Sequence, residues 1–374
     1  MMFAFDHLGL RLRLFARRWL RAPALDWPLA LALLLLAGVG LANLYSAGGP
    51  DTKVAFNQGA RFVLGAMLMV LLSRVSPQSL RKWTPWLYAG SVLLLLVVAV
   101  LGEGRGAHRW LDLKVFRFQP SELSKLTMPM MAAWVLSRRE LPPKFASLAI
   151  VGALIAVPAA LIAKQPDLGT ALLVVASGMF VIFLAGMAWW RIGLVLAAAA
   201  AAAPVAWHFM HDYQKKRLFT FLDPAADRLG DGWHIMQSEI AVGSGGLWGK
   251  GWQHGTQSAL EFLPEHTTDF AFAVFSEEWG LVGVTAVILL YIFIVGRGLM
   301  IAANARDTYS RLLAGSISMS FFVYVMVNGG MVAGILPVVG VPMPLISYGG
   351  TSVVALLAGF GMLMSIHNHR RAPH

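Results

Sequence analysis

Ten long runs of apolar residues constrain this chain more than any other feature of its sequence. A helix of about 20 mainly apolar residues crosses the hydrocarbon core of a bilayer. The runs therefore predict an all-α membrane protein, a polytopic bundle of about ten transmembrane helices with a large extracytoplasmic loop between spans seven and eight. They lie near residues 27–46, 56–73, 85–101, 121–137, 146–163, 168–186, 190–210, 270–296, 310–334 and 350–367.

The predicted helices belong to one integral membrane domain over residues 1–374. Its two non-spanning parts are a basic cytoplasmic amino terminus at 1–26 and the large extracytoplasmic loop at 211–269. Pro85, Pro120 and Pro129 interrupt or border the third and fourth runs. Pro120 suits the start of a helix, where its missing N–H is not needed.

The composition also requires a lipid environment. Hydrophobic residues make up 57% of the 374 residues and charged residues 13%, whereas a soluble domain has about 25% charged residues. Cysteine is absent, which excludes disulfides, thiol catalysis and cysteine-ligated metals. A soluble enzyme, a secreted disulfide scaffold and a zinc ribbon are therefore excluded.

The net charge of +11 is explained by topology. With both termini in the cytoplasm, the short loops on that side hold seventeen Lys and Arg residues, and the opposite short loops hold six. Short cytoplasmic loops are enriched in Lys and Arg, so we expect a multi-pass protein with both termini in the cytoplasm. The basic start RLRLFARRWLR at 11–21 is interpreted as a topology determinant, since no DNA-binding motif accompanies it.

The remaining polar residues gather in four regions that this topology places outside. In the first region, Glu122 and Lys125 lie three residues apart on one face of a helix. Such a pair either neutralises itself as a structural ion pair or uses Lys125 to bind a phosphate and Glu122 to orient the lysine. Arg109, next to Trp110, is a second candidate phosphate contact or an interface anchor. The four regions are 102–125, 164–170, 211–269 and 336–352.

Two short segments carry further candidates. Asp167 precedes Leu168 and suits either a helix N-cap or a functional site. The stretch LPVVGVPMPLISYGGTS at 336–352 is rich in proline, and non-helical backbone at membrane depth is tolerated only where it is buried or lines a cavity. We interpret it as a lipid-tail groove or a re-entrant turn.

The long loop at 211–269 exceeds the length of most loops without a function. Glycines cluster between Gly243 and Gly255 around Trp248 and Trp252. This pattern suits a segment that lies along the membrane surface.

Asp269 is the most informative single residue. It stands at the outer edge of the eighth span, between Thr268 and Phe270. Desolvation at this depth would raise its pKa, which suits a general base that accepts a proton near neutral pH. The alternative is a helix N-cap shared with Thr267 or Thr268.

Five ordered motifs resemble the SEDS family of shape, elongation, division and sporulation proteins, over most of residues 25–370. Short loops and the phrase HDYQKKR at 211–217 favour the elongation branch of that family over its division branch. The motifs are QPSELSK at 119–125, QPDLGT at 165–170, HGTQS at 254–258, LPEHTTDF at 263–270 and LPVVGVPMPLISYGG at 336–350.

The resemblance implies a peptidoglycan glycosyltransferase of the bacterial inner membrane. It would be a hexosyltransferase whose substrate is lipid II, an undecaprenyl-diphosphate-linked disaccharide-peptide. Such enzymes polymerise lipid II into β-1,4 glycan strands for lateral wall elongation and rod shape. The implied partners are a class B penicillin-binding protein with transpeptidase activity, other elongation-complex proteins and membrane lipid, but not nucleic acid.

The resemblance also implies roles for individual residues. The family's essential aspartate maps onto Asp269, and its substrate-binding polar positions map onto Arg109, Glu122, Lys125 and Asp167. Family members commonly carry a histidine two residues before the aspartate, where this chain has Thr267, with His266 displaced by one.

The implied reaction agrees with the residues. It needs a base for the acceptor hydroxyl, which we assign to Asp269, and positive charge for the departing pyrophosphate, for which Arg109 and Lys125 are candidates. No cofactor is required by the sequence. A divalent cation, Mg²⁺ or Mn²⁺, is compatible with the pyrophosphate, and no ligand cluster in the sequence demands one.

Two other functions use the same residues. A flippase that transports the lipid-linked precursor would need polar groups that continue to the cytoplasmic side, and Arg61 is the main other intramembrane charge. A non-catalytic scaffold for the partner transpeptidase would use Asp269 only as a helix cap.

Overall fold

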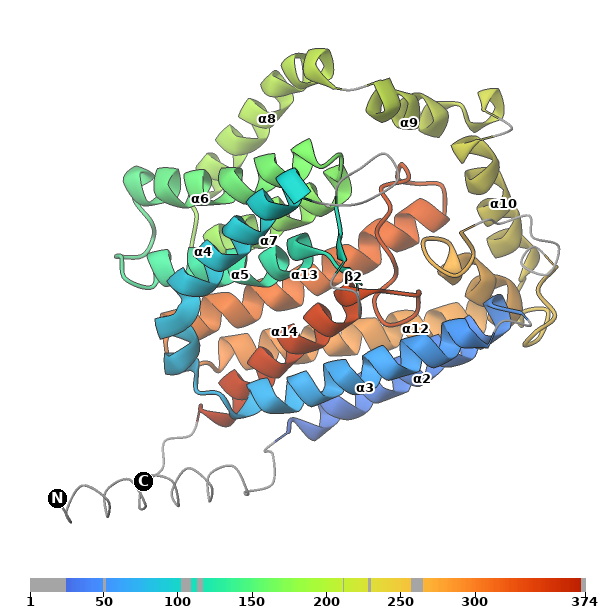
Figure 1. Ribbon diagram of the computed structural model, residues 1–374, viewed down its shortest axis with the longest axis horizontal. Helices are drawn as coiled ribbons and strands as arrows, with labels where there is room; N and C mark the ends of the chain where they lie inside the picture. The colour runs from blue at the N-terminus through green and yellow to red at the C-terminus, as the bar shows by residue number, and fades with distance from the viewer. Residues whose placement is uncertain are drawn as a thin grey trace.

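The computed structural model describes residues 25–49, 52–101, 109–112, 117–210, 212–227, 230–256 and 265–370. Ten long helices dominate these residues, and each overlaps one apolar run of the sequence, so the predicted all-α bundle is confirmed (Figure 1). The helices are α2 Trp27–Ala47, α3 Lys53–Arg74, α4 Pro77–Leu101, α5 Pro120–Leu136, α6 Phe145–Lys164, α7 Leu168–Leu184, α8 Trp189–Phe209, α12 Ala271–Ala303, α13 Thr308–Val332 and α14 Thr351–Asn368.

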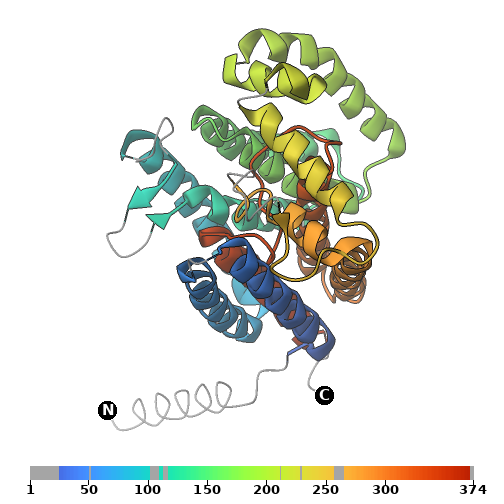
Figure 2. The same ribbon diagram turned by 90° about the vertical axis from the view of Figure 1, so that its right-hand side faces the viewer.

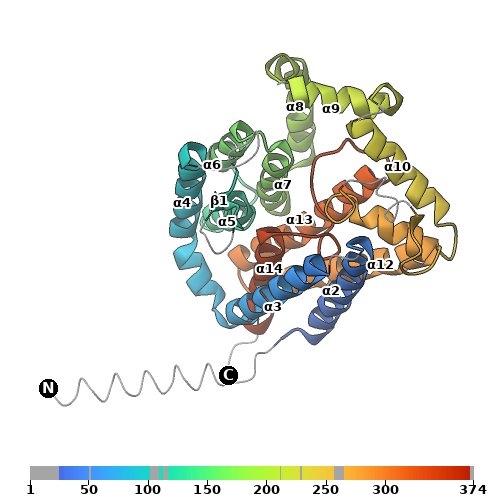
Figure 3. The ribbon, with the colours of Figure 1, turned by 45° about the vertical axis from the view of Figure 1, so that its right-hand side comes forward.

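Seven of these helices are long and apolar enough to cross a membrane, judged on the described residues by length and composition, and α7 is a shorter apolar helix. The protein is therefore a polytopic membrane protein. Helices α13 and α14 are the most enclosed of the seven, and α14 lies between α3 and α13 (Figures 1 and 3). In α14, a Cβ on Gly361 would lie 2.6 Å from the carbonyl oxygen of Met69, so the close approach of α3 and α14 depends on this glycine.

Helix α4 begins eight residues earlier than predicted, because Pro85 lies inside the helix and does not interrupt it. The Ser76 hydroxyl accepts a hydrogen bond from Ser79 N–H at 3.2 Å, as an N-terminal capping residue does. Proline is tolerated inside a membrane helix when neighbouring groups satisfy the freed backbone atoms. Hydropathy alone placed the start too late, since the first turns of α4 carry polar residues.

The long segment between α8 and α12 is largely helical. It forms α9 Asp212–Leu222, the short 3₁₀ helix η1 Pro224–Ala226 and α10 Asp231–Ser244. Helix α10 packs against α12, and α8, α9 and α10 form an arch at the edge of the bundle (Figures 2 and 3). Two short strands, β1 Leu111–Asp112 and β2 Arg117–Phe118, pair antiparallel just before α5.

Helix α12 contains a break at Gly280 that the hydropathy pattern did not predict. Gly280 has φ 61° and ψ −165°, a conformation that favours glycine. A Cβ there would collide with the backbone nitrogen of Gly249. The glycine-rich segment docks at this break, where Lys250 N–H donates to Glu277 O at 3.0 Å and Leu281 N–H donates to Gly246 O at 2.9 Å. Its glycines therefore serve close backbone packing.

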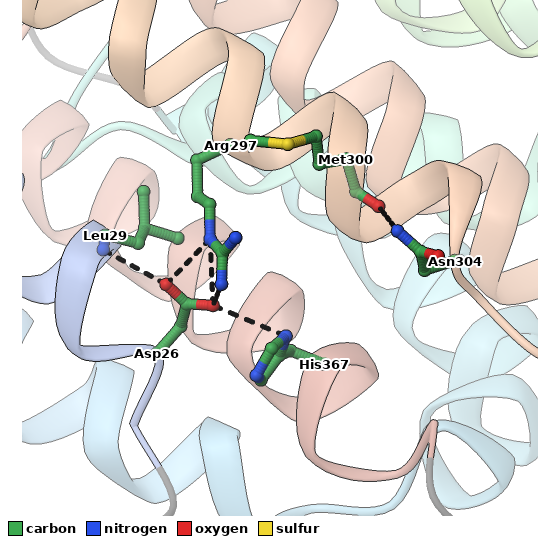
Figure 4. A network of polar contacts seen from close by, with 6 residues as sticks. All are labelled: Asp26, Leu29, Arg297, Met300, Asn304 and His367. Atoms are coloured by element: carbon green, nitrogen blue, oxygen red, sulfur yellow. Dashed lines mark hydrogen bonds and ion pairs between the residues drawn. The ribbon is translucent and has the colours of Figure 1, made fainter.

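A charge cluster centred on the buried Asp26 joins α2, α12 and α14 (Figure 4). The carboxylate of Asp26 caps α2 by accepting from Leu29 N–H at 3.1 Å. It also pairs with Arg297 of α12, whose Nη2 lies 2.7 Å away, and with His367 of α14, whose Nδ1 lies 3.3 Å away. Burial raises the pKa of Asp26, but its bonds to Arg297 and Leu29 outweigh burial and lower it. We call these three side chains the Asp26 cluster.

Candidate active site

A polar cavity of about 340 Å³ brings together all five residues that the sequence singled out. Its wall is formed by α5, the start of α7, the turn at 265–270, the 336–350 loop and the start of α14. Arg109 and Trp110 next to β1 and Arg217 of α9 complete it. The five predicted residues in the wall are Arg109, Glu122, Lys125, Asp167 and Asp269.

Glu122 and Lys125 form an ion pair on the first two turns of α5. Lys125 Nζ lies 2.7 Å from Glu122 Oε1, and the two side chains are 12% and 9% exposed. The ammonium group also lies 5.2 Å from the centre of the Tyr324 ring, within reach of a cation–π contact. The pair predicted from the spacing is therefore present, and it faces the cavity.

Arg109 and Asp167 are held by the turn between α6 and α7. Arg109 Nε donates to Gln165 O at 2.9 Å, and its guanidinium group also bonds Pro166 O. Asp167 caps α7 by accepting from Thr170 N–H at 3.2 Å. Its second oxygen accepts from Gln119 Nε2 at 2.9 Å. Asp167 is therefore a helix cap that also lies in the cavity wall, and its part in a functional site stays a prediction.

Asp269 lies at the end of the turn that precedes α12. The capping residue of α12 is Phe270, with no side-chain hydrogen bond, so the alternative of Asp269 as a helix cap is wrong. The half-buried carboxyl faces the cavity, and burial, assisted by the nearby charge of Glu265, raises its pKa to about 6. Arg217 opposes this shift. A carboxylate with this pKa is ionised at neutral pH and accepts a proton readily.

Arg217 and Tyr348 also line the cavity, and sequence reasoning assigned neither of them a role. Arg217 comes from α9, and its Nη1 donates to Val338 O at 3.4 Å. Its only signal in the sequence was the basic phrase HDYQKKR at 211–217. Tyr348 N–H donates to Thr267 O at 2.8 Å, and the Arg61 guanidinium lies 4.4 Å from the centre of the Tyr348 ring.

Side chains from distant helices fix the 336–350 loop. Gln58 of α3 is fully buried. Its Nε2 donates to Ser347 O and its Oε1 accepts from Gly349 N–H, both at 3.3 Å. The Tyr291 hydroxyl of α12 donates to Pro344 O at 2.6 Å. The loop is thus non-helical backbone at membrane depth whose polar groups are satisfied by protein.

A narrower apolar cavity of about 70 Å³ adjoins the polar one. It shares Glu122 and Lys125 with the polar cavity and then runs between α5, α7, α13 and α14. Its deeper wall is apolar, with Leu173, Phe321 and Phe360 among its residues. The proline-rich segment lines it through Pro342 to Leu345, as the interpretation of that segment as a lipid-tail groove requires.

Among the described residues, no group of three or more His, Asp or Glu side chains is arranged to hold a metal ion.

Known proteins show similarity over nearly the whole chain. The family model for FtsW, RodA and SpoVE, described as cell cycle protein, matches residues 26–372. Peptidoglycan glycosyltransferase MrdB of Escherichia coli strain K12 is 49% identical over 349 residues, which cover 93% of this chain and 94% of MrdB. The MrdB of Helicobacter pylori strain J99 is 37% identical over 327 residues, covering 84% and 83% of the two chains.

Two solved structures have the same fold. One belongs to a study of the structural coordination of polymerization and crosslinking by a peptidoglycan synthase complex, with a TM-score of 0.82 and 32% identity over 93% of this chain and 99% of that one. The other is the rod shape determining protein RodA of Thermus thermophilus, with a TM-score of 0.72 and 30% identity over 95% and 99% of the two chains.

Proposed function

The chain belongs to the FtsW, RodA and SpoVE family of cell cycle proteins, and from this premise we propose how it works as a peptidoglycan glycosyltransferase. The similarity to MrdB and RodA confirms the elongation branch, so the enzyme serves rod-shape maintenance. The mechanism below assigns roles to the residues of the polar cavity.

The proposed substrate is lipid II, which the enzyme polymerises into β-1,4 glycan strands. The 4-hydroxyl oxygen of the acceptor sugar attacks C1 of the donor sugar, and the bond between C1 and the diphosphate oxygen breaks. The hydroxyl proton passes to a carboxylate, and undecaprenyl pyrophosphate leaves with the electron pair. Attack from the face opposite to the leaving group converts the α-linked donor into a β-linked product without a covalent enzyme intermediate.

Asp269 is the proposed general base. The single observation that carries this role is a half-buried carboxyl, with a pKa raised to about 6, that faces a cavity lined with cations. At neutral pH this carboxyl is ionised, yet it is more basic than an ordinary aspartate. A general base works best when its pKa lies near the working pH.

Three cations are available for the diphosphate: Arg109, Lys125 and Arg217. Arginine binds phosphate oxygens bidentately and lysine supplies a point charge. Glu122 orients Lys125 through their 2.7 Å ion pair. Asp167 orients Gln119 and caps the start of α7. This cap fixes the α6–α7 turn, whose carbonyl oxygens hold Arg109. These contacts support the substrate-binding roles of all four predicted residues.

The adjoining apolar cavity is the proposed entry of the lipid tail. It begins at Lys125, so a tail placed there has its diphosphate beside the cations. Burial of apolar chain segments is favourable by about 0.8 kcal/mol per CH₂. A divalent cation, Mg²⁺ or Mn²⁺, would accompany the pyrophosphate as part of the substrate, because such ions prefer oxygen ligands. No step of the mechanism depends on it.

The proposed setting is the bacterial inner membrane, with both termini in the cytoplasm and residues 211–269 outside. The peptidoglycan synthase complex among the similar structures couples polymerization to crosslinking. By analogy, we assign this chain a class B penicillin-binding protein as partner, together with other elongation-complex proteins. The chain acts as a single membrane domain over residues 1–374.

The test is lipid II polymerisation by the purified chain mixed with its partner transpeptidase. Asp269→Asn keeps the shape of the side chain but removes its basicity, so we expect glycan formation to fall by at least about 100-fold, in line with general-base contributions. Asp307→Asn is the matched control, since Asp307 caps α13 by accepting from Ser310 N–H and lies outside the cavity wall. Its polymerisation rate should equal that of the wild type.

Two outcomes would contradict the proposal. If Asp269→Asn polymerised lipid II at the wild-type rate, Asp269 would not be the general base. Transport of lipid II across proteoliposome membranes without any glycan product would favour a flippase instead.

A further inference from the structure

Asn328 of α13 forms a bridge that the mechanism above does not use. Its side chain is fully buried. The amide nitrogen Nδ2 donates to Asp269 O at 2.9 Å and to Val341 O at 2.7 Å. Both partners are carbonyl oxygens, which only accept, so the amide group must turn its NH₂ toward them. The amide oxygen Oδ1 is left without a hydrogen-bond partner in the described residues.

The two carbonyls belong to two segments of the cavity wall that are distant in the sequence. Asp269 carries the carboxylate, and Val341 belongs to the 336–350 loop. The two segments are close to each other, because a Cβ on Gly340 would lie 3.6 Å from Asp269 Oδ2. Together with the backbone bond from Tyr348 to Thr267, this NH₂ group sets the spacing between the backbone of the base and the 336–350 loop.

Two neighbouring hydrogen bonds hold the residues on either side of Asp269 in the chain. Asn43 Nδ2 donates to Ala271 O at 2.9 Å, on the helical side of Asp269. Tyr348 N–H donates to Thr267 O at 2.8 Å, on the other side. Of these three bonds, the one from Asn328 is the one that reaches the backbone carbonyl of Asp269 itself, between Thr267 and Ala271.

We propose that Asn328 is a positioning residue for the polymerisation reaction, which holds the Asp269 carboxylate at a fixed distance from the Gly340–Pro342 wall. The inference rests on the proposed function of Asp269. Displacement of a catalytic group by about 1 Å can cost 100-fold in rate, so the bridge matters for turnover more than for substrate binding.

Two variants of Asn328 remove its two hydrogen bonds to different extents. Asn328→Leu removes both hydrogen bonds, and Asn328→Asp keeps at most one, which it donates only when protonated. We expect kcat of lipid II polymerisation to fall about 100-fold in Asn328→Leu, with an intermediate value in Asn328→Asp and little change in KM. Ser238→Ala is the matched control, because Ser238 is equally buried and donates to Val332 O at 2.8 Å, away from the cavity wall. Its kcat should not change.

The pH profile separates positioning from a general loss of folded protein. A displaced Asp269 gains contact with water, so the acid limb of kcat/KM should move to lower pH in Asn328→Leu. A purely structural defect lowers kcat/KM at every pH and lowers the apparent melting temperature, but it leaves the pH of the acid limb unchanged. That result would overturn the inference. Wild-type kcat in Asn328→Leu would overturn it as well.

The failure of this inference differs from the failure of the proposed function. An active wild type, an inactive Asp269→Asn and a fully active Asn328→Leu overturn only the role of Asn328. A fully active Asp269→Asn overturns the proposed base, and the positioning role falls with it.

Discussion

At the scale of single residues, the charge of Asp269 is controlled by two neighbours of opposite sign. Burial and Glu265 raise its pKa, and Arg217 lowers it. Glu265 is four residues away in the same turn, whereas Arg217 belongs to α9, in the long segment between α8 and α12. The sequence predicted a raised pKa from depth alone, but the arginine could not be found, because no periodicity links α9 to the turn.

This arrangement predicts the pH dependence of the enzyme. Below its pKa of about 6, Asp269 is protonated and cannot accept the hydroxyl proton, so kcat/KM should fall as the pH falls through about 6. Arg217→Gln removes the charge that lowers this pKa and should shift the acid limb to higher pH. Glu265→Gln removes the charge that raises it and should shift the limb to lower pH. Initial rates of polymerisation between pH 5 and pH 8 measure both shifts, and movement of both limbs in the same direction would contradict the assignment.

At the scale of secondary structure elements, hydropathy predicts where the helices lie but does not predict where they break, where they begin or how they contact one another. Each predicted run became one helix, because a long apolar segment in lipid must satisfy its own backbone hydrogen bonds. The break at Gly280 and the early start of α4 depend on partners distant in the sequence or on polar turns, which an apolar window does not register. The Asp26 cluster is of the same kind, since its three side chains come from helices at both ends of the chain.

The Asp26 cluster should contribute measurably to stability. Loss of one partner of a buried ion pair costs about 3–5 kcal/mol. Arg297 is 27% exposed and screened by solvent, so Asp26→Asn should cost about 2 kcal/mol and lower the apparent melting temperature by several degrees. The control is Glu140→Gln, whose pair with Lys144 is largely exposed and should give no measurable change. Equal melting temperatures for all three proteins in detergent would show that the cluster is energetically neutral.

At the scale of the whole molecule, the five candidate site residues left over from the topology meet in one cavity. The prediction that they lie on one face grouped Arg109, Glu122, Lys125, Asp167 and Asp269 without any contact information, and the structure places all five in one wall. The Glu122–Lys125 pair was predicted from its spacing, but the contacts between different segments could not be predicted, because they depend on how the helices pack. The same applies to Gln58 and Asn328, which resemble ordinary polar residues of a membrane helix in the sequence.

The orientation of the whole molecule can be tested directly, because the chain contains no cysteine. A single Ser244→Cys lies at the exposed carboxyl end of α10, and a single Asn304→Cys lies at the exposed carboxyl end of α12. In intact spheroplasts, a membrane-impermeant maleimide should label Ser244→Cys and should label Asn304→Cys only after permeabilisation. The reverse pattern would invert the proposed topology, and the cysteine-free wild type gives the background.

The bonds from Gln58 to the 336–350 loop have a consequence for biosynthesis. Gln58 is part of the second span to leave the ribosome, and its partner Ser347 follows 289 residues later. During nearly the whole period of translation, a buried amide of α3 lacks the backbone groups that will satisfy it. The wall of the cavity can therefore close only after the 336–350 loop has been made, so a nascent chain that stops after α13 has inserted its earlier helices but has no finished site for lipid II.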